Sequence, residues 1–179
     1  MELHTRQHPS IPGQRHTIPT IDAVLERFPD TLTTLDLKDL RAAAVAPLCT
    51  LLRTLKRTRD VYIGVDTAEQ VMLFRQLCPE VRTSGTDAER TAMRAARAVN
   101  DASFVTDQLV SQPSFVAADG TKRITREFVA YSHSKNIAVL PWVVDDPADM
   151  TDLINIGIDG IYTRRPDVMV TLLHQMGLR

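Results

Sequence analysis

From residue 21 onward, short runs rich in β-branched residues alternate with amphipathic stretches of about 10 to 15 residues. This alternation is typical of βα units that build a parallel sheet covered by helices. The chain has 179 residues, of which 44% are hydrophobic and 24% are charged. These values are ordinary for one soluble globular domain. The sequence therefore predicts an α/β fold in a single domain.

Local signals predict where the elements lie. Strands are expected at residues 33–37, 61–65, 81–84, 137–144 and 160–163. The spacing of Thr67 to Gln70 and of Thr86 to Glu89 predicts capping boxes at two helix starts, and Asp146 predicts an N-cap at a third.

Two segments lack a clear period. Residues 103–121 contain apolar pieces interrupted by Pro113 and Gly120, so we interpret them as a long loop that holds at most one short strand. Residues 1–17 have no periodic apolar pattern, and we expect an irregular arm there. The predicted domain then comprises residues 18–179.

The charge balance excludes several classes of partner. Lys and Arg number 21 against 22 Asp and Glu, and the formal net charge of −1 gives no general attraction to nucleic acid or to an anionic membrane surface. No apolar run approaches the roughly 18 residues that span a bilayer, and the first residues have no apolar core of a signal peptide. We therefore expect a cytoplasmic protein with no nucleic-acid partner and no membrane span.

The two cysteines are interpreted as structural. Cys49 and Cys78 are too few and too far apart in the sequence for a disulfide scaffold, and neither neighbours a histidine that would complete a metal knuckle. The sequence predicts two buried free thiols in a reducing compartment.

The length limits the architecture. A closed barrel of eight βα units needs about 200 to 250 residues, which exceeds this chain after its arm is subtracted. The predicted strands therefore fit part of a TIM-type barrel. An open, doubly wound sheet of five strands fits the length equally well and is the structural alternative.

Asp36 and Lys38 form the first candidate site. Because side chains alternate along a strand, Leu35 and Leu37 face one way, while Asp36 and Lys38 face the other. In α/β folds ligands bind at the carboxyl ends of the strands, where a carboxylate suits a divalent cation and an ammonium suits a phosphate. A solvated salt bridge at the end of a strand is the alternative interpretation.

Three further positions stand out less strongly. Trp142, the only tryptophan, lies near the end of a predicted strand and is able to form an apolar wall over a ligand, although core or rim packing explains a single tryptophan as well. Residues 157–166 form a glycine-entered strand that leaves through two arginines, which suits an anion or a solvated turn. His133 has no carboxylate in register on its own helix, so a structural or exposed role is favoured.

Four stretches, taken in order, resemble the glycerophosphodiester phosphodiesterase family. They are Ile18–Leu25, which is similar to the family's entry into the helix before its fourth strand; Leu35–Lys38, similar to its Ile-Glu-Ile-Lys strand; Trp142–Asp146, similar to its Trp-Thr-Val-Asn segment; and Gly157–Pro166, similar to its closing Gly-Val-Asp-Gly-Ile-Ile-Thr-Asp-Arg-Pro. The resemblance spans roughly residues 18–176.

The resemblance implies a TIM barrel that hydrolyses glycerophosphodiesters to glycerol phosphate and an alcohol with a divalent cation, Mg²⁺ or Ca²⁺. By that likeness Asp36 takes the place of a metal-ligand carboxylate, Lys38 of a phosphate contact, and Trp142 of a residue that lines the substrate pocket. Three departures from the family pattern matter. Asp36 is one methylene shorter than the usual glutamate, Asp145 stands where asparagine is usual, and Arg164 replaces an aspartate and reverses the local charge.

The family's N-terminal motifs do not occur in this sequence. Members open with a His-Arg-Gly strand, a Glu-x-Asp strand and a His-Asp strand, which supply two metal ligands and the catalytic histidine pair. His4, His8 and His16 lie in the unpatterned arm, where they are not expected to replace that pair. We therefore expect the last five βα units of a barrel, inactive alone and without catalytic residues.

Three functional hypotheses follow. The first is a truncated phosphodiesterase whose N-terminal strands come from a complementing fragment. The second is a non-catalytic remnant that keeps a vestigial metal and phosphate site and associates with itself. The third is an unrelated α/β domain that binds phosphate, which the order of the four stretches disfavours. In the first two cases we expect strands 33–37 and 160–163 to be exposed edges, with Leu35 and Leu37 partly uncovered.

Overall fold

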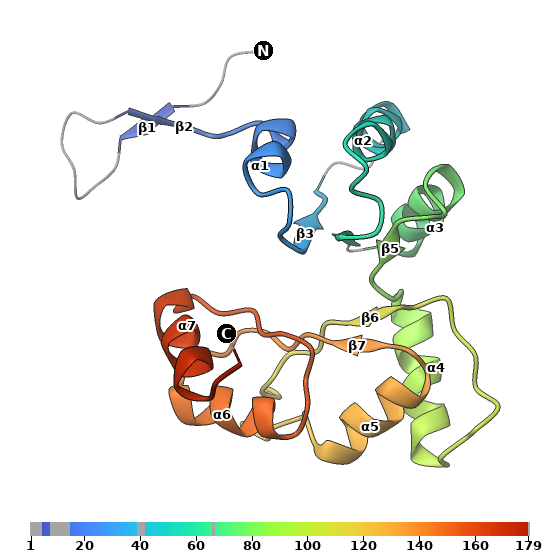
Figure 1. Ribbon diagram of the computed structural model, residues 1–179. Coiled ribbons are helices and arrows are strands. Elements are labelled where there is room, and N and C mark those ends of the chain that lie inside the picture. The colour runs from blue at the N-terminus through green and yellow to red at the C-terminus, as the bar shows by residue number, and fades with distance from the viewer. Residues whose placement is uncertain (1–4, 8–14, 39–41, 66, 179) are drawn as a thin grey trace.

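The structure, a computed structural model, describes residues 5–7, 15–38, 42–65 and 67–178. Strands and helices alternate after residue 20, which confirms the predicted α/β class (Figure 1). The elements are, in order, β1 (Thr5–Gln7), β2 (Arg15–Thr17), α1 (Ile21–Arg27), β3 (Thr33–Asp36), α2 (Ala42–Thr54), β4 (Val61–Gly64), α3 (Ala68–Leu77), β5 (Arg82–Thr83), α4 (Asp87–Ala98), β6 (Val110–Ser111), α5 (Arg126–Ser134), β7 (Ala138–Val139), α6 (Pro147–Asn155) and α7 (Pro166–Gln175).

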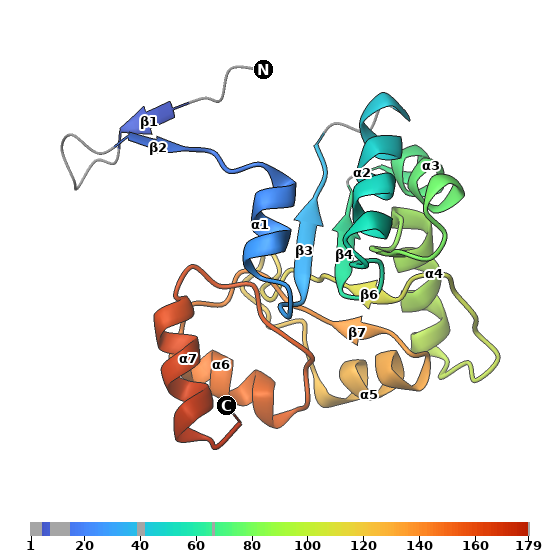
Figure 2. The same cartoon turned by 45° about the horizontal axis from the view of Figure 1, so that its top comes forward.

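The strands from β3 to β7 run parallel and follow chain order. β3, β4 and β5 form one sheet, in which Asp36 pairs with Gly64, and β6 and β7 form a second. A parallel bridge between Ser84 and Val110 leads from the first sheet to the second. Figure 2 shows β3 beside β4, with β6 and β7 below them. The described strands therefore lack the reversal of order that marks a doubly wound sheet, and that alternative loses its support.

One prediction about a strand is confirmed, and one is wrong. The stretch 103–121 holds the short strand β6, as its interpretation allowed. Residues 160–163 form no strand, although the Tyr162 N–H donates to the Pro141 carbonyl at 3.0 Å and the Val144 N–H donates to the Tyr162 carbonyl at 3.0 Å. This segment has a parallel neighbour on one side over too few residues to make a continuous ladder.

The N-terminal arm is partly regular, contrary to the prediction. β1 and β2 pair antiparallel, with Arg6 opposite His16. The backbone N–H and C=O groups of the two short segments thereby become each other's hydrogen-bond partners. Figure 1 shows this pair extending away from the other elements. His4 and His8 lie outside the described residues. The boundary between an arm of residues 1–17 and a domain of residues 18–179 stays a prediction.

The predicted helix starts are confirmed. The side chains of Thr67 and Thr86 each accept a hydrogen bond from the N–H three residues later, and both capping boxes are complete. The Asp146 carboxylate accepts from the N–H groups of the first turn of α6. Gly157, with φ +89°, follows α6 in the left-handed region that favours glycine. No helix in the described ranges is long and apolar enough to cross a membrane.

The apolar core lies between strands and helices in two main clusters. The first surrounds β4 and α1 to α3, and its buried residues are Leu25, Val45, Cys49, Leu52, Val61, Ile63, Val65, Val71, Phe74, Cys78 and Val81. The second surrounds β7 and α5 to α7, and its buried residues are Phe115, Ile124, Val129, Val139, Val144, Met150 and Leu153. Leu35 and Leu37 are partly buried against the first cluster, so part of each side chain stays uncovered, as expected.

The two cysteines form a disulfide, which corrects the prediction of free thiols. Cys49 lies on α2 and Cys78 caps α3, and their Cα atoms are 5.8 Å apart. The packing of α2 on α3 brings together two residues that are 29 positions apart, which spacing in the sequence did not reveal. The prediction of a reducing, cytoplasmic compartment was based partly on free thiols, and that part of its support is gone. The location itself stays a prediction.

Candidate functional site

The carboxyl end of β3 carries the first pair of candidate residues. Asp36 is the last residue of the strand, and Lys38 lies two residues after it. Leu35 and Leu37 pack toward the helices, so alternation directs Thr34 and Asp36 to the opposite side of the sheet, as predicted. On the neighbouring strand β4, Tyr62 lies opposite Thr34 in the ladder.

Asp36 and Lys38 contact each other. The Lys38 Nζ atom lies 3.0 Å from Asp36 Oδ2, and the two side chains are 66% and 60% exposed, respectively. This is the solvated salt bridge that was the alternative interpretation. An ion pair so exposed contributes little to stability, so either partner is able to exchange it for a ligand at small cost.

The described residues do not make a metal site by themselves. Among them, no three His, Cys, Asp or Glu side chains gather closely enough to hold an ion. Asp36 offers carboxylate oxygens, whereas a bound Mg²⁺ or Ca²⁺ is surrounded by six or more oxygen ligands. Asp36 is therefore suited to supply one ligand of a cation site, but it does not form such a site alone.

Trp142 lies at the rim of a cleft. Its side chain is 46% exposed, and the indole Nε1–H donates to the Gln112 carbonyl at 2.8 Å. Ser114 forms a parallel bridge with Trp142, which fixes the backbone at this position. The ring is thus held at the surface of the cleft rather than in the core, in agreement with a pocket wall.

A hydrogen-bonded network that the sequence did not reveal crosses the site. The Gln112 Nε2 group donates to the Tyr162 hydroxyl, and that hydroxyl donates to Thr34 Oγ1 at 3.2 Å. Tyr162 therefore connects the first parallel strand to the last parallel segment of the chain. Alternation along β3 placed Thr34 on the face of Asp36, but its partners come from segments far away in the sequence.

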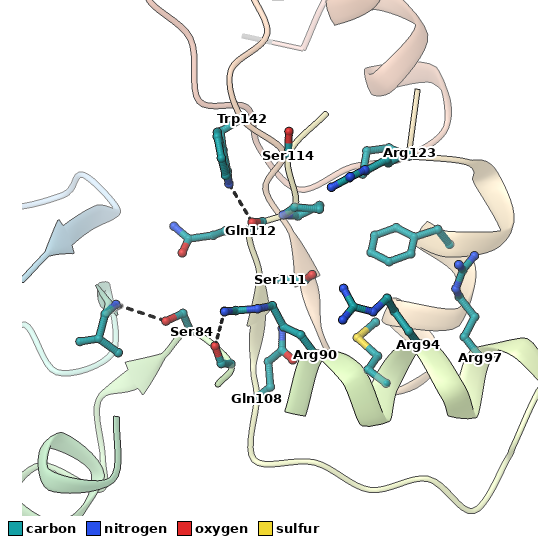
Figure 3. Close-up of a pocket in the computed structure, with 16 residues that line it drawn as sticks. Ser84, Arg90, Arg94, Arg97, Gln108, Ser111, Gln112, Ser114, Arg123 and Trp142 are labelled. Atoms are coloured by element: carbon teal, nitrogen blue, oxygen red, sulfur yellow. Dashed lines mark hydrogen bonds between the residues drawn. The ribbon is translucent and has the colours of Figure 1, made fainter. Parts of the chain in front are cut away.

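The cleft beside Trp142 has a volume of about 780 Å³. Figure 3 shows its lining, with Arg90, Arg94 and Arg97 on α4 and Arg123 on the opposite side. The spacing of four and three residues places the three helical arginines on one face of α4. The predicted site residues do not include these arginines, although their spacing is visible in the sequence.

The two departures near residue 145 compensate each other. Asp145 Oδ1 accepts from the Arg164 N–H at 2.8 Å, and Asp145 Oδ2 accepts from Arg164 Nε at 2.7 Å. The hydrogen bonds from the Arg164 backbone and guanidinium lower the pKa of the Asp145 carboxyl. The arginine that reverses the local charge is therefore paired with the aspartate that replaces asparagine.

His133 has a carboxylate partner after all. Its Nε2 atom lies 2.9 Å from Asp159 Oδ2, and the same oxygen accepts from the Val139 N–H at 2.7 Å. The partner comes from the segment after α6, so inspection of the histidine's own helix could not reveal it. Both side chains are exposed, which agrees with the structural role favoured for His133.

Comparison with known proteins identifies the family. Residues 2–168 match the sequence profile of the glycerophosphoryl diester phosphodiesterase family. The chain belongs to this family. The match begins at residue 2 rather than 18, so it includes the arm. Members of this phosphodiesterase family act on small glycerophosphodiester substrates and are generally dependent on divalent metal ions.

A comparison with individual proteins agrees with this family assignment. The Mycobacterium tuberculosis protein named "Probable glycerophosphodiester phosphodiesterase 2" is 26% identical over 171 residues, which cover 92% of this chain and 63% of that protein. The chain therefore spans less than two thirds of that relative's length.

Solved structures of phosphodiesterases share the fold. A glycerophosphoryl diester phosphodiesterase domain from Mycobacterium tuberculosis has a TM-score of 0.69 at 13% identity, covering 95% of this chain and 70% of that one. An Oleispira antarctica phosphodiesterase in complex with its product sn-glycerol-3-phosphate has a TM-score of 0.59 at 15% identity, covering 88% and 62%. The parallel α/β architecture described above is thus that of a TIM-barrel family.

Proposed function

We propose that this chain forms the last part of a TIM-type barrel and supplies one side of a glycerophosphodiester phosphodiesterase site. In this proposal Asp36 is a metal ligand, and Lys38 and Trp142 contact the substrate. The observation that carries it is the position of Asp36 and Lys38 at the carboxyl end of a parallel strand, because barrel enzymes build their sites at that end.

Lys38 is proposed to hold a phosphodiester oxygen. Its ammonium group is a mobile point charge on a largely exposed side chain, which suits a phosphate. Breaking the ion pair with Asp36 costs little, since that pair is exposed and weak. Asp36 is then free to contribute an oxygen to a cation, while other segments supply the remaining ligands.

Trp142 is proposed to form a wall against the substrate. The hydrogen bond from its Nε1 atom to Gln112 fixes the orientation of the indole, and nearly half of the side chain is accessible. A fixed aromatic face restricts how a bound glycerol or alcohol group is oriented.

The site proposed for this chain alone is incomplete. The described residues gather no three potential metal ligands, and the sequence contains no His-Arg-Gly, Glu-x-Asp or His-Asp segment of the family. Loss of a positioned acid or base reduces catalysis by roughly 10² to 10⁴ per group. We therefore expect negligible hydrolysis of glycerophosphocholine or of an aryl phosphodiester by the isolated chain.

Hydrolysis assays with and without added divalent cation test the proposal. The isolated chain should show no turnover above its Lys38→Ala variant, and adding a segment that carries the three absent motifs should restore turnover that Lys38→Ala then lowers. Cation-dependent turnover by the isolated chain, clearly above the Lys38→Ala control, would show that the prediction of inactivity is wrong. If the restored turnover is the same in the Lys38→Ala variant, the proposed role of Lys38 is wrong.

Titration calorimetry tests Asp36 separately. If the chain retains affinity for a divalent cation, Asp36→Asn should abolish most of it, because the substitution removes the anionic oxygen. His133→Gln is the matched control, since His133 contacts Asp159 instead of the proposed site. Equal effects of the two variants would contradict the assignment of Asp36.

A non-catalytic remnant that associates with itself is the second candidate. The observation that favours it is the Asp36–Lys38 ion pair, in which the two candidate side chains contact each other. Failure of the added segment to restore hydrolysis, despite its binding to the chain, would favour this candidate. Membership of the phosphodiesterase family removes the third hypothesis, an unrelated phosphate-binding domain.

A further inference from the structure

The cleft next to Trp142 carries an unusual concentration of positive charge. Arg90, Arg94 and Arg97 line it from one face of α4, and Arg123 lines it from the segment before α5 (Figure 3). No Asp, Glu, Lys or His belongs to the lining, although acidic and basic residues are nearly equal in number over the whole chain. We call this cavity the arginine cleft.

Two of these four arginines, Arg94 and Arg97, have no acidic partner among the described residues. Arg90 is held by Asp87 at 2.5 Å and by the Gly85 carbonyl. Arg94 donates to Thr91 Oγ1 at 2.9 Å, and the Arg97 guanidinium lies 5.4 Å from the centre of the Phe128 ring, so neither is paired with a carboxylate. Arg123 makes no close ion pair with a described carboxylate, but its charge helps to lower the pKa of the Asp119 carboxyl. Like charges one helical turn apart are unfavourable, and several guanidinium groups that line one cavity attract an anion.

The arginine cleft also contains an unmatched acceptor. Gln108 lines it and is buried, and its Nε2 group donates to the Val110 carbonyl at 2.9 Å. Its Oε1 atom is buried without a hydrogen-bond partner among the described residues. This oxygen packs against Gly85, where an added β-carbon would lie 2.4 Å from it, so it belongs to the wall of the cleft and is not exposed to a ligand.

The arginine cleft adjoins the proposed catalytic side. A β-carbon placed on Gly64 would lie 3.8 Å from the Asp36 Cα atom and 3.6 Å from Gln112 Oε1. Gln112 in turn lines the arginine cleft and accepts the hydrogen bond from Trp142. The end of β3 and the arginine cleft are therefore connected through Gly64 and Gln112.

We propose that the arginine cleft binds a phosphate group on the alcohol half of the substrate. The preferred substrates are then glycerophosphodiesters whose alcohol carries a phosphate group, and a phosphorylated inositol is used as the probe. This inference rests on the proposed function, because it assigns the scissile diester to Lys38 and the second phosphate to the arginines. Guanidinium groups suit that role, since their planar fork donates two parallel hydrogen bonds to phosphate oxygens.

Calorimetry on the full chain in a chelating buffer tests the proposal without catalysis. The matched probes are glycerophosphoinositol 4-phosphate and glycerophosphoinositol, which differ by one phosphate. The phosphorylated probe should bind about ten- to a hundredfold more tightly, the range expected for one or two charge-assisted hydrogen bonds. Arg94→Gln and Arg123→Gln should each remove most of this preference.

Arg59→Gln is the matched control. Arg59 is exposed just before β4, at the opposite end of the strand from the arginine cleft, and its substitution removes the same charge. It should leave the preference unchanged, and circular dichroism of all three variants checks that they fold. Equal affinity for the two probes, or equal effects of Arg59→Gln and Arg94→Gln, would overturn the proposal.

Inorganic phosphate distinguishes a general anion site from a substrate site. It should compete weakly with the phosphorylated probe, because it lacks the glycerol and inositol groups. If it binds as tightly as that probe, the assignment of a substrate class is wrong. If the two probes bind equally while Lys38-dependent hydrolysis is intact, only the phosphate site in the arginine cleft is wrong. If the phosphorylated probe is preferred but hydrolysis cannot be restored, only the proposed function is wrong.

Discussion

Tyr62 lies on the same face of the sheet as Thr34 and Asp36, and its hydroxyl is buried. That hydroxyl has no hydrogen-bond partner among the described residues, and burial raises the pKa of the Tyr62 phenol. A buried polar group without a partner costs stability, because it loses its bond to water and gains none.

Tyr62→Phe should therefore stabilise the fold. We expect the free energy of unfolding to rise by about 1 kcal/mol, since the substitution removes an unsatisfied hydroxyl and keeps the ring. Tyr131→Phe is the control, because the Tyr131 hydroxyl donates to the Asp101 carbonyl at 3.1 Å and its removal should lower the free energy of unfolding. Urea denaturation measures both, and destabilisation by Tyr62→Phe would show that the hydroxyl has a partner.

At the scale of elements, α4 depends on Glu89. One carboxylate oxygen accepts from Arg75 at 2.7 Å and the other from the Thr86 N–H at 2.6 Å. Burial raises the pKa of Glu89, but the hydrogen bonds from Arg75 and from the Thr86 N–H outweigh it, so the pKa is lower than usual. The ionised form is thus favoured in the folded state.

The contribution of Glu89 should disappear in acid. A pKa that is lower in the folded than in the unfolded state gives stability above the ordinary value of 4.5, which is lost as the pH falls through the folded value. Glu89→Gln should lower the free energy of unfolding by about 1 to 2 kcal/mol at neutral pH and by progressively less below the ordinary glutamate pKa. Glu69→Gln, at an exposed first-turn position of α3, should have little effect at any pH. A pH-independent effect of Glu89→Gln would contradict the ion pair.

The disulfide joins α2 to α3. Closing a loop between residues 29 positions apart restricts the unfolded chain and stabilises the fold by about 3 to 4 kcal/mol. A reducing agent should therefore lower the melting temperature of the oxidised protein, as followed by circular dichroism. The variant carrying both Cys49→Ala and Cys78→Ala should melt at the same temperature with or without the reductant. An unchanged melting temperature for the reduced parent chain would show that the bond does not contribute.

For the whole molecule, the arrangement of strands has an edge at β3. Among the described strands, β3 pairs only with β4, so one row of its backbone groups faces away from the sheet. The Tyr162–Thr34 hydrogen bond connects this edge to the last parallel segment at a single point. Phe28 and Leu32, which lie between α1 and β3, are 52% and 80% exposed.

We expect this edge to make the isolated chain associate with itself. Unpaired strand edges and exposed apolar side chains drive association, and a segment carrying the preceding family strands should compete with it. Light scattering at increasing concentration should detect oligomers, and Leu32→Asp should reduce them. Val105→Asp is the control, since Val105 is equally exposed in the connection between α4 and β6. A monomer at all concentrations, with one sharp unfolding transition, would show that the chain closes on itself in another way.

Local signals in the sequence determined the parts of this protein that depend on a few neighbouring residues. The capping boxes at Thr67 and Thr86 and the facing of Leu35 against Asp36 follow from hydrogen bonds and side-chain alternation within a short segment. The order of the four family stretches identified the family for the same reason, since motif residues and their spacing are carried by the chain itself.

Only the tertiary structure decided which distant segments meet. The Cys49–Cys78 bond, the His133–Asp159 contact and the Gln112–Tyr162–Thr34 network each join residues from different elements. The arginine cleft exists because the tertiary structure places the segment of Arg123 opposite α4. The physical reason is that packing of helices and strands fixes these distances, whereas spacing along the chain constrains only neighbours within a helical turn or a strand.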